Sequence, residues 1–131
     1  MPLVALVVDD SMLIRHTVCR FLEERGFVVE SATNGMEALE LLGRTRPDLI
    51  ITDMQMPKMG GSELIAHVKS KPETAKIPII VLSSRQSGGF AGQESQAEYA
   101  IYKDIDIDSQ LKKALQVTLG ISASKGHKSG K

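Results

Sequence analysis

The sequence has one cysteine and no tryptophan, aromatic residues make up only 4% of it, and its formal net charge is zero. A single cysteine, Cys19, excludes an internal disulfide framework and is typical of a reducing compartment, so we expect a cytoplasmic protein. Sixteen basic residues balance sixteen acidic ones, which argues against a protein that binds nucleic acid or a membrane surface. No apolar run approaches the ~20 residues of a transmembrane helix, and we expect no secretion signal.

The length of 131 residues fits one domain. The composition changes at the C-terminal end, where residues 122–131 contain three lysines and no acidic residue. We therefore expect a single folded domain over residues 1–121, followed by a flexible basic tail or linker remnant over residues 122–131.

Short apolar runs alternate with segments of helical period. Strands are predicted at residues 3–8, 27–32, 49–52, 77–82 and 99–102. Four helices are predicted. The first covers residues 11–26, the second begins at Asn34, the third begins with a cap at Ser62, and the fourth contains Leu111 and ends at Gly120. This alternation predicts an α/β fold with a five-stranded parallel sheet and helices on both faces. Three glycines within residues 87–92 predict that the helix before the last strand is short or irregular.

Polar residues follow four of these strands. Asp9 and Asp10 follow the first strand, Asp53 the third, Ser83 the fourth and Lys103 the fifth. Ligands of an open parallel sheet bind beyond the carboxyl ends of its strands. If these strands are neighbours, the five side chains meet in one crevice.

Three carboxylates in one crevice need a counter-charge, because two carboxylates about 4 Å apart repel by roughly 4 kcal/mol at an effective dielectric constant near 20. An acidic site with oxygen ligands suits Mg²⁺, and aspartate is a known nucleophile toward phosphorus. A lysine can compensate the charge of a phosphoryl group. The pattern favours magnesium-dependent phosphoryl chemistry, although an Asp-Asp pair alone can also be a helix cap and the other residues ordinary loop residues.

Three segments resemble one known family over about residues 3–120. Residues 7–11 (Val-Val-Asp-Asp-Ser), 47–61 around Asp53, and 77–84 are similar to the receiver domain of two-component response regulators, the CheY-like domain. The resemblance implies a flavodoxin-like (βα)5 fold with the strand order 2-1-3-4-5, which is already known for CheY.

The resemblance also implies roles for the acidic residues. Asp53 accepts a phosphoryl group from a histidine kinase or a histidine phosphotransfer protein. Asp10, Asp53 and the backbone carbonyl of Gln55 bind Mg²⁺ directly, and Asp9 binds it through water or helps to position it.

Further roles are implied for residues around the phosphoryl group. Ser83 and Lys103 bind the group, and Ser83 moves on activation. From their positions two residues after Asp53 and Ser83, we also predict that Gln55 and Arg85 border the approach of the hydrolytic water and so tune the lifetime of the aspartyl phosphate. The chemistry acts on the domain itself, so we expect no enzyme in the multiple-turnover sense, but a switch that changes binding to a downstream protein. The sequence names neither the kinase, the target nor the oligomeric state.

Two alternatives remain at this stage. Ala100 and Asp104 stand where the family usually has an aromatic residue and a proline, which leaves room for a degenerate receiver that binds partners independently of phosphorylation. A phosphohydrolase of the haloacid-dehalogenase type also uses an aspartate nucleophile. Such enzymes have two acids separated by one residue, whereas Asp9 and Asp10 are adjacent and Gln55 lies two positions after Asp53.

Overall fold

The computed structural model describes residues 2–83, 97–103 and 106–120. Their elements in chain order are β1 (Val4–Val8), α1 (Met12–Glu23), β2 (Val28–Ala32), α2 (Gly35–Leu42), β3 (Leu49–Asp53), α3 (Gly61–Ser70), β4 (Ile79–Ser83), β5 (Tyr99–Tyr102) and α4 (Ile107–Leu119). All five predicted strands are present. The predicted irregular helix between the last two strands and the predicted tail lie outside the described residues.

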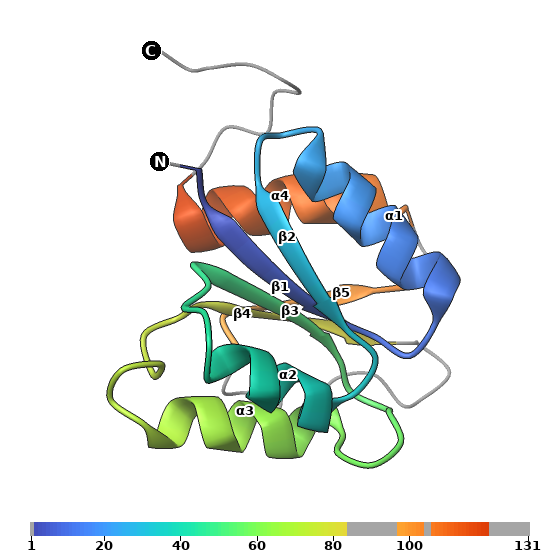
Figure 1. Ribbon diagram of the computed structural model, residues 1–131. Coiled ribbons are helices and arrows are strands. Elements are labelled where there is room, and N and C mark those ends of the chain that lie inside the picture. The colour runs from blue at the N-terminus through green and yellow to red at the C-terminus, as the bar shows by residue number, and fades with distance from the viewer. Residues whose placement is uncertain (1, 84–96, 104–105, 121–131) are drawn as a thin grey trace.

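The five strands form one parallel sheet in the order β2-β1-β3-β4-β5 (Figure 1). This confirms the predicted fold class and strand order. The central strands β3 and β4 are fully buried because both of their faces are covered, and they are apolar except for Thr52 and their last residues, Asp53 and Ser83. β2 lies at the edge and carries Glu30, whose position in a strand predicted this placement.

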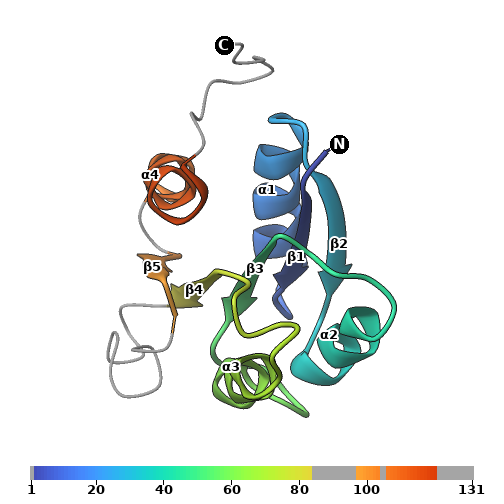
Figure 2. The ribbon, with the colours of Figure 1, turned by 90° about the vertical axis from the view of Figure 1, so that its left-hand side faces the viewer.

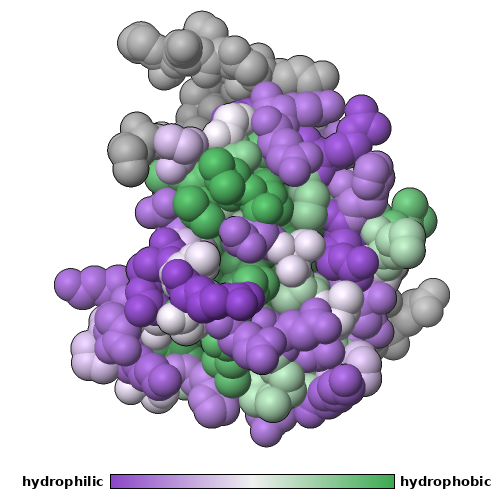
Figure 3. All heavy atoms as spheres, in the orientation of Figure 1, coloured by the Kyte–Doolittle hydropathy of each residue, from purple (hydrophilic) through white to green (hydrophobic). Residues whose placement is uncertain are grey.

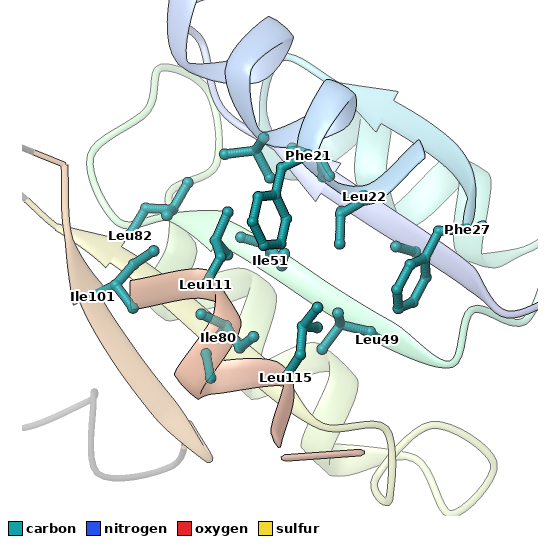
Figure 4. Packing of buried hydrophobic residues seen from close by; sticks show 14 residues of the cluster. Phe21, Leu22, Phe27, Leu49, Ile51, Ile80, Leu82, Ile101, Leu111 and Leu115 are labelled. Carbon is teal, nitrogen blue, oxygen red and sulfur yellow. The ribbon is translucent and has the colours of Figure 1, made fainter. Parts of the chain in front are cut away.

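Helices cover both faces of the sheet. α1 and α4 lie on one face, and α2 and α3 lie on the other (Figure 2). Each face has its own apolar core, and Figure 4 shows the core under α1 and α4, where Phe21 and Leu111 from the helices meet Ile51 and Leu82 from the strands. Hydrophilic side chains cover most of the surface seen in Figure 3, with apolar ones showing in small groups between them.

Side-chain hydrogen bonds mark the starts of two helices, and the predicted start of a third differs from the structure. Ser11 accepts the Ile14 N–H and starts α1, and Asn34 accepts the Glu37 N–H and starts α2. The predicted cap at Ser62 is wrong, because α3 begins at Gly61 with Gly60 as its N-cap and without a side-chain cap. The cause is a close approach of backbones: the Gly61 N–H donates to the Met54 carbonyl oxygen at 3.1 Å.

None of the described helices is long and apolar enough to cross a lipid bilayer.

Candidate functional site

The sheet brings two of the acidic residues side by side. β1 ends at Val8, which pairs with Thr52 in β3, so Asp9 and Asp53 each come next along neighbouring strands. The N–H of Asp9 donates to the carbonyl oxygen of Ala32 in β2 and holds Asp9 in line with the sheet. The side chain of Asp10 completes the group, because Asp9, Asp10 and Asp53 each place one carboxylate oxygen within 4.8 Å of the others.

The two adjacent aspartates differ in their surroundings. Asp9 is fully buried, whereas Asp10 is exposed. The Ser11 N–H donates to Asp9 Oδ1 at 2.8 Å. Asp9 Oδ2 is buried and accepts no hydrogen bond from the described residues, although Lys103 Nζ lies 3.2 Å away as an ion-pair partner without hydrogen-bond alignment.

Lys103 links the acidic residues across the sheet. Its Nζ lies 3.0 Å from Asp53 Oδ1 and 3.2 Å from Asp9 Oδ2, with 20% of its side chain exposed. The backbone N–H of Lys103 donates to the Ser83 carbonyl oxygen at 2.8 Å, directly after β5. One ammonium group is therefore shared by two buried carboxylates.

The two carboxylate oxygens of Asp53 have different partners. Oδ1 accepts the Met54 N–H at 2.8 Å and the Gln55 N–H at 3.4 Å, and it also contacts Lys103. Oδ2 accepts no hydrogen bond from the described residues. The backbone therefore orients the Asp53 carboxylate through one oxygen, and the other oxygen has no hydrogen bond from these residues.

The electrostatics of the cluster are dominated by burial. Burial raises the pKa of Asp9 above its ordinary value, against the lowering effect of the Ser11 N–H and Lys103. Burial and the neighbouring Asp9 charge raise the pKa of Asp53. Burial acts to lower the pKa of Lys103, but the hydrogen bond to Asp53 and the charges of both aspartates outweigh it and raise that pKa. As far as residues 2–83, 97–103 and 106–120 show, the site thus has more negative than positive charge.

Two of the other predicted residues, Ser83 and Gln55, lie at the same end of the sheet with fewer contacts. Ser83 ends β4 and is buried, but its hydroxyl makes no hydrogen bond to the described residues. Gln55 is exposed in the loop after β3. Arg85 lies outside the described residues.

One contact of the acidic turn was not predicted from the sequence. Arg15 Nη1 donates to the backbone carbonyl oxygen of Asp9 at 2.9 Å and so holds the turn that carries Asp9 and Asp10. In the sequence, only the position of Arg15 indicates this role: it lies four residues after Ser11, one helical turn into α1.

The amino-acid sequence of residues 5–116 matches the family model described as the response regulator receiver domain. The chain belongs to this family. This membership removes the haloacid-dehalogenase alternative, since the chemistry of a receiver domain is confined to its own phosphorylation.

Solved structures agree with this assignment. The chemotaxis response regulator CheY4 of Vibrio cholerae superposes with a TM-score of 0.82 at 32% sequence identity, covering 91% of this receiver domain chain and 100% of CheY4. The receiver domain of the sensor histidine kinase PA1611 from Pseudomonas aeruginosa has the same fold, with a TM-score of 0.79 at 20% identity over 92% of this chain and 100% of that one.

Curated relatives are longer proteins. The response regulator MprA of Mycobacterium sp. (strain KMS) is 34% identical over 113 residues, which are 85% of this chain and 48% of MprA. The gliding motility regulatory protein of Myxococcus xanthus is 44% identical over 82 residues, 63% of this chain and 11% of that protein. The receiver domain chain therefore spans about half the length, or less, of these relatives.

Proposed function

We propose that this receiver domain is a phosphorylation-controlled switch in which Asp53 accepts a phosphoryl group from a histidine kinase or a histidine phosphotransfer protein. The observation that carries the proposal is the state of the Asp53 carboxylate. Oδ1 is held by the Met54 N–H and Lys103, while Oδ2 accepts no hydrogen bond from the described residues. An oriented carboxylate with one oxygen available is what a nucleophile toward phosphorus requires.

In the proposed reaction, Asp53 Oδ2 forms a bond to phosphorus while the bond from phosphorus to the histidine nitrogen of the donor breaks. The product is an acyl phosphate on Asp53 and a neutral histidine after the nitrogen takes up a proton. Lys103 then pairs with a phosphoryl oxygen, and the Ser83 hydroxyl donates a hydrogen bond to another one. Hydrolysis returns Asp53 and inorganic phosphate, at a rate that Gln55 and Arg85 tune.

The donor set fits Mg²⁺. Within the described ranges, three carboxylates whose oxygens lie within 4.8 Å of one another form an oxygen-ligand site with an excess of negative charge, and one of them has a buried oxygen without a hydrogen bond. We assign direct metal ligands to Asp10, Asp53 and the Gln55 carbonyl, and a water-mediated or positioning role to Asp9. When bound, the ion compensates the charge of the phosphoryl oxygens. The related receiver domain of PA1611 holds a magnesium ion in its active-site cleft.

Phosphorylation adds negative charge and strong hydrogen-bond acceptors where Lys103 is shared by two acids. The new phosphoryl group competes for this ammonium and for the Ser83 hydroxyl, and we propose that the resulting conformation binds a downstream protein better. The domain that switches extends over residues 1–121, with residues 122–131 as a tail.

Acetyl phosphate or beryllofluoride with Mg²⁺ tests the proposal, with intact-protein mass spectrometry for the phosphoryl adduct and fluorine NMR for the beryllofluoride adduct. We expect an adduct on the wild type that requires Mg²⁺ and is absent in Asp53→Asn. Absence of the adduct from the wild type, or an equal adduct in Asp53→Asn, would refute the proposal.

Two further variants separate the finer assignments. We expect Arg85→Ala to change the lifetime of the aspartyl phosphate, and an unchanged lifetime would remove Arg85 from the path of the water. Equal partner binding by phosphorylated wild type and Asp53→Asn would instead favour a degenerate receiver. The ion pairs of Lys103 with Asp53 and Asp9 support the switching function over this alternative.

A further inference from the structure

The side chain of Gln110 joins the end of β5 to the beginning of α4. The Tyr102 N–H donates to Gln110 Oε1 at 2.9 Å, and Gln110 Nε2 donates to the Tyr102 carbonyl oxygen at 2.8 Å. Gln110 Nε2 also lies 3.3 Å from the carbonyl oxygen of Asp106, the N-cap of α4. One amide group therefore binds both backbone groups of Tyr102 and the start of the helix.

This pair of bonds lies on the outer side of β5. The Lys103 N–H donates inward to Ser83 in β4. Successive residues of a strand direct their backbone groups to opposite sides, so the N–H and carbonyl of Tyr102 face away from β4. The amide of Gln110 takes the place of a neighbouring strand at this edge of the sheet.

The helix that carries Gln110 is firmly placed. The next residue, Leu111, is fully buried and packs with Leu82 of β4 and Ile101 of β5 in the core under α1 and α4 (Figure 4). The side chain of Gln110 can therefore hold the end of β5 at a defined position, because core packing fixes the backbone of the helix that carries it.

The residue that follows Tyr102 is Lys103, whose ammonium lies 3.0 Å from Asp53 Oδ1. The backbone of Lys103 is held on one side by Ser83 and, through Tyr102, on the other side by Gln110. We propose that Gln110 is a positioning residue for Lys103 and so sets the rate at which Asp53 accepts a phosphoryl group. This inference rests on the proposed function.

The test compares rates of phosphorylation by acetyl phosphate with Mg²⁺. Gln110→Met keeps the length of the side chain and removes both hydrogen bonds to Tyr102, and we expect a rate about three- to tenfold lower because the ammonium is displaced from Asp53. Gln110→Glu keeps the acceptor and loses the donor, so its rate should lie between the rates of the wild type and Gln110→Met. Gln116→Met, at an exposed position of the same helix, is the matched control and should behave as the wild type.

A double-mutant cycle with Lys103→Met separates positioning from general destabilisation. If Gln110 acts through Lys103, Gln110→Met causes no further loss of rate once Lys103 has been replaced. A merely structural effect lowers the rate by the same factor in both backgrounds. All rates are measured at a temperature where unfolding curves show each variant to be folded, and Gln110→Glu carries the comparison if Gln110→Met does not fold.

The possible outcomes distinguish this inference from the proposed function. A wild type that takes no phosphoryl group overturns the proposed function itself. A phosphorylated wild type with a Gln110→Met rate within twofold of it, or with equal factors in both backgrounds, overturns only the positioning role of Gln110.

Discussion

Replacing Asp9 with asparagine should stabilise the domain in the absence of divalent cations. Asparagine keeps the shape of the side chain and the oxygen that accepts the Ser11 N–H, and it removes a buried negative charge. The direction follows from burial, because Asp9 is fully buried and its burial raises its pKa despite the nearby ammonium of Lys103.

The magnitude follows from three contributions. With an effective dielectric constant near 20, the contact of 3.2 Å to Lys103 is worth about 5 kcal/mol of attraction. At the 4.8 Å limit within which the carboxylate oxygens of Asp9 and Asp53 lie, repulsion is about 3.5 kcal/mol at the same dielectric constant. The remaining attraction of about 2 kcal/mol is smaller than the several kcal/mol needed to bury an ion. We therefore expect a gain of about 1–3 kcal/mol for Asp9→Asn.

Thermal unfolding in EDTA at pH 7.5 measures this gain, with about 4 °C expected for each kcal/mol in a domain of this size. Asp108→Asn, which removes an exposed carboxylate from α4, is the control for net charge. Mg²⁺ should stabilise the wild type by about 1.4 kcal/mol at ten times its Kd, and should stabilise Asp9→Asn less.

The dependence on pH has a defined sign. Because folding raises the pKa of Asp9, protonation of this group favours the folded state. The gain in stability of Asp9→Asn over the wild type is therefore complete above the raised pKa of Asp9. It decreases as the pH falls below that pKa toward the ordinary value of 3.8. A variant that melts below the wild type in EDTA at pH 7.5 would show that the ion pair with Lys103 outweighs burial, and the reasoning would be refuted.

Three further changes test the local structure around the site, each by urea unfolding. Lys58 has a φ of 68°, which disfavours residues with a Cβ, so Lys58→Gly should raise the free energy of unfolding by about 0.5 kcal/mol; a decrease would contradict this. A Cβ at Gly61 would overlap the carbonyl oxygen of Asp53, and Gly61→Ala should lower stability by about 2 kcal/mol or more; wild-type stability would mean that the loop yields freely. Asn34→Ala removes the N-cap of α2 and should lower stability by about 1 kcal/mol, unlike Asn34→Ser.

The strand pattern predicted the fold and the meeting of the acidic residues for a simple physical reason. Apolar runs such as residues 49–51 and 79–82 lie in the interior of a parallel sheet, and the polar residues that follow each run must emerge at the same edge. The positions of Asp9 and Asp53 therefore follow from strand order alone. The sequence does not say which member of the Asp9–Asp10 pair is buried, because the turn into α1 decides that.

Other features could not be predicted from the sequence because they depend on contacts that form only in the folded chain. Ser62 has the better capping side chain, yet Gly61 starts α3, since only glycine fits beside the carbonyl oxygen of Asp53. Gln110 is one polar residue on a helix, and its partner Tyr102 is eight residues away. No spacing rule marks such a pair, and only the packing of α4 against β5 reveals it.

The balance of charge favours a metal-binding over a purely structural explanation of the acidic cluster. Among the described residues, three carboxylates face one ammonium, so a divalent cation would balance their charges. A buried charge that serves stability alone needs an oppositely charged partner, because an unpaired buried charge is strongly destabilising. Apolar residues in place of the whole pair are often at least as stable. Asp9 instead keeps a buried oxygen that accepts no hydrogen bond from the described part of the chain. We therefore expect a neutral residue at this position to stabilise the domain in the absence of divalent cations, and a bound cation to reduce that gain.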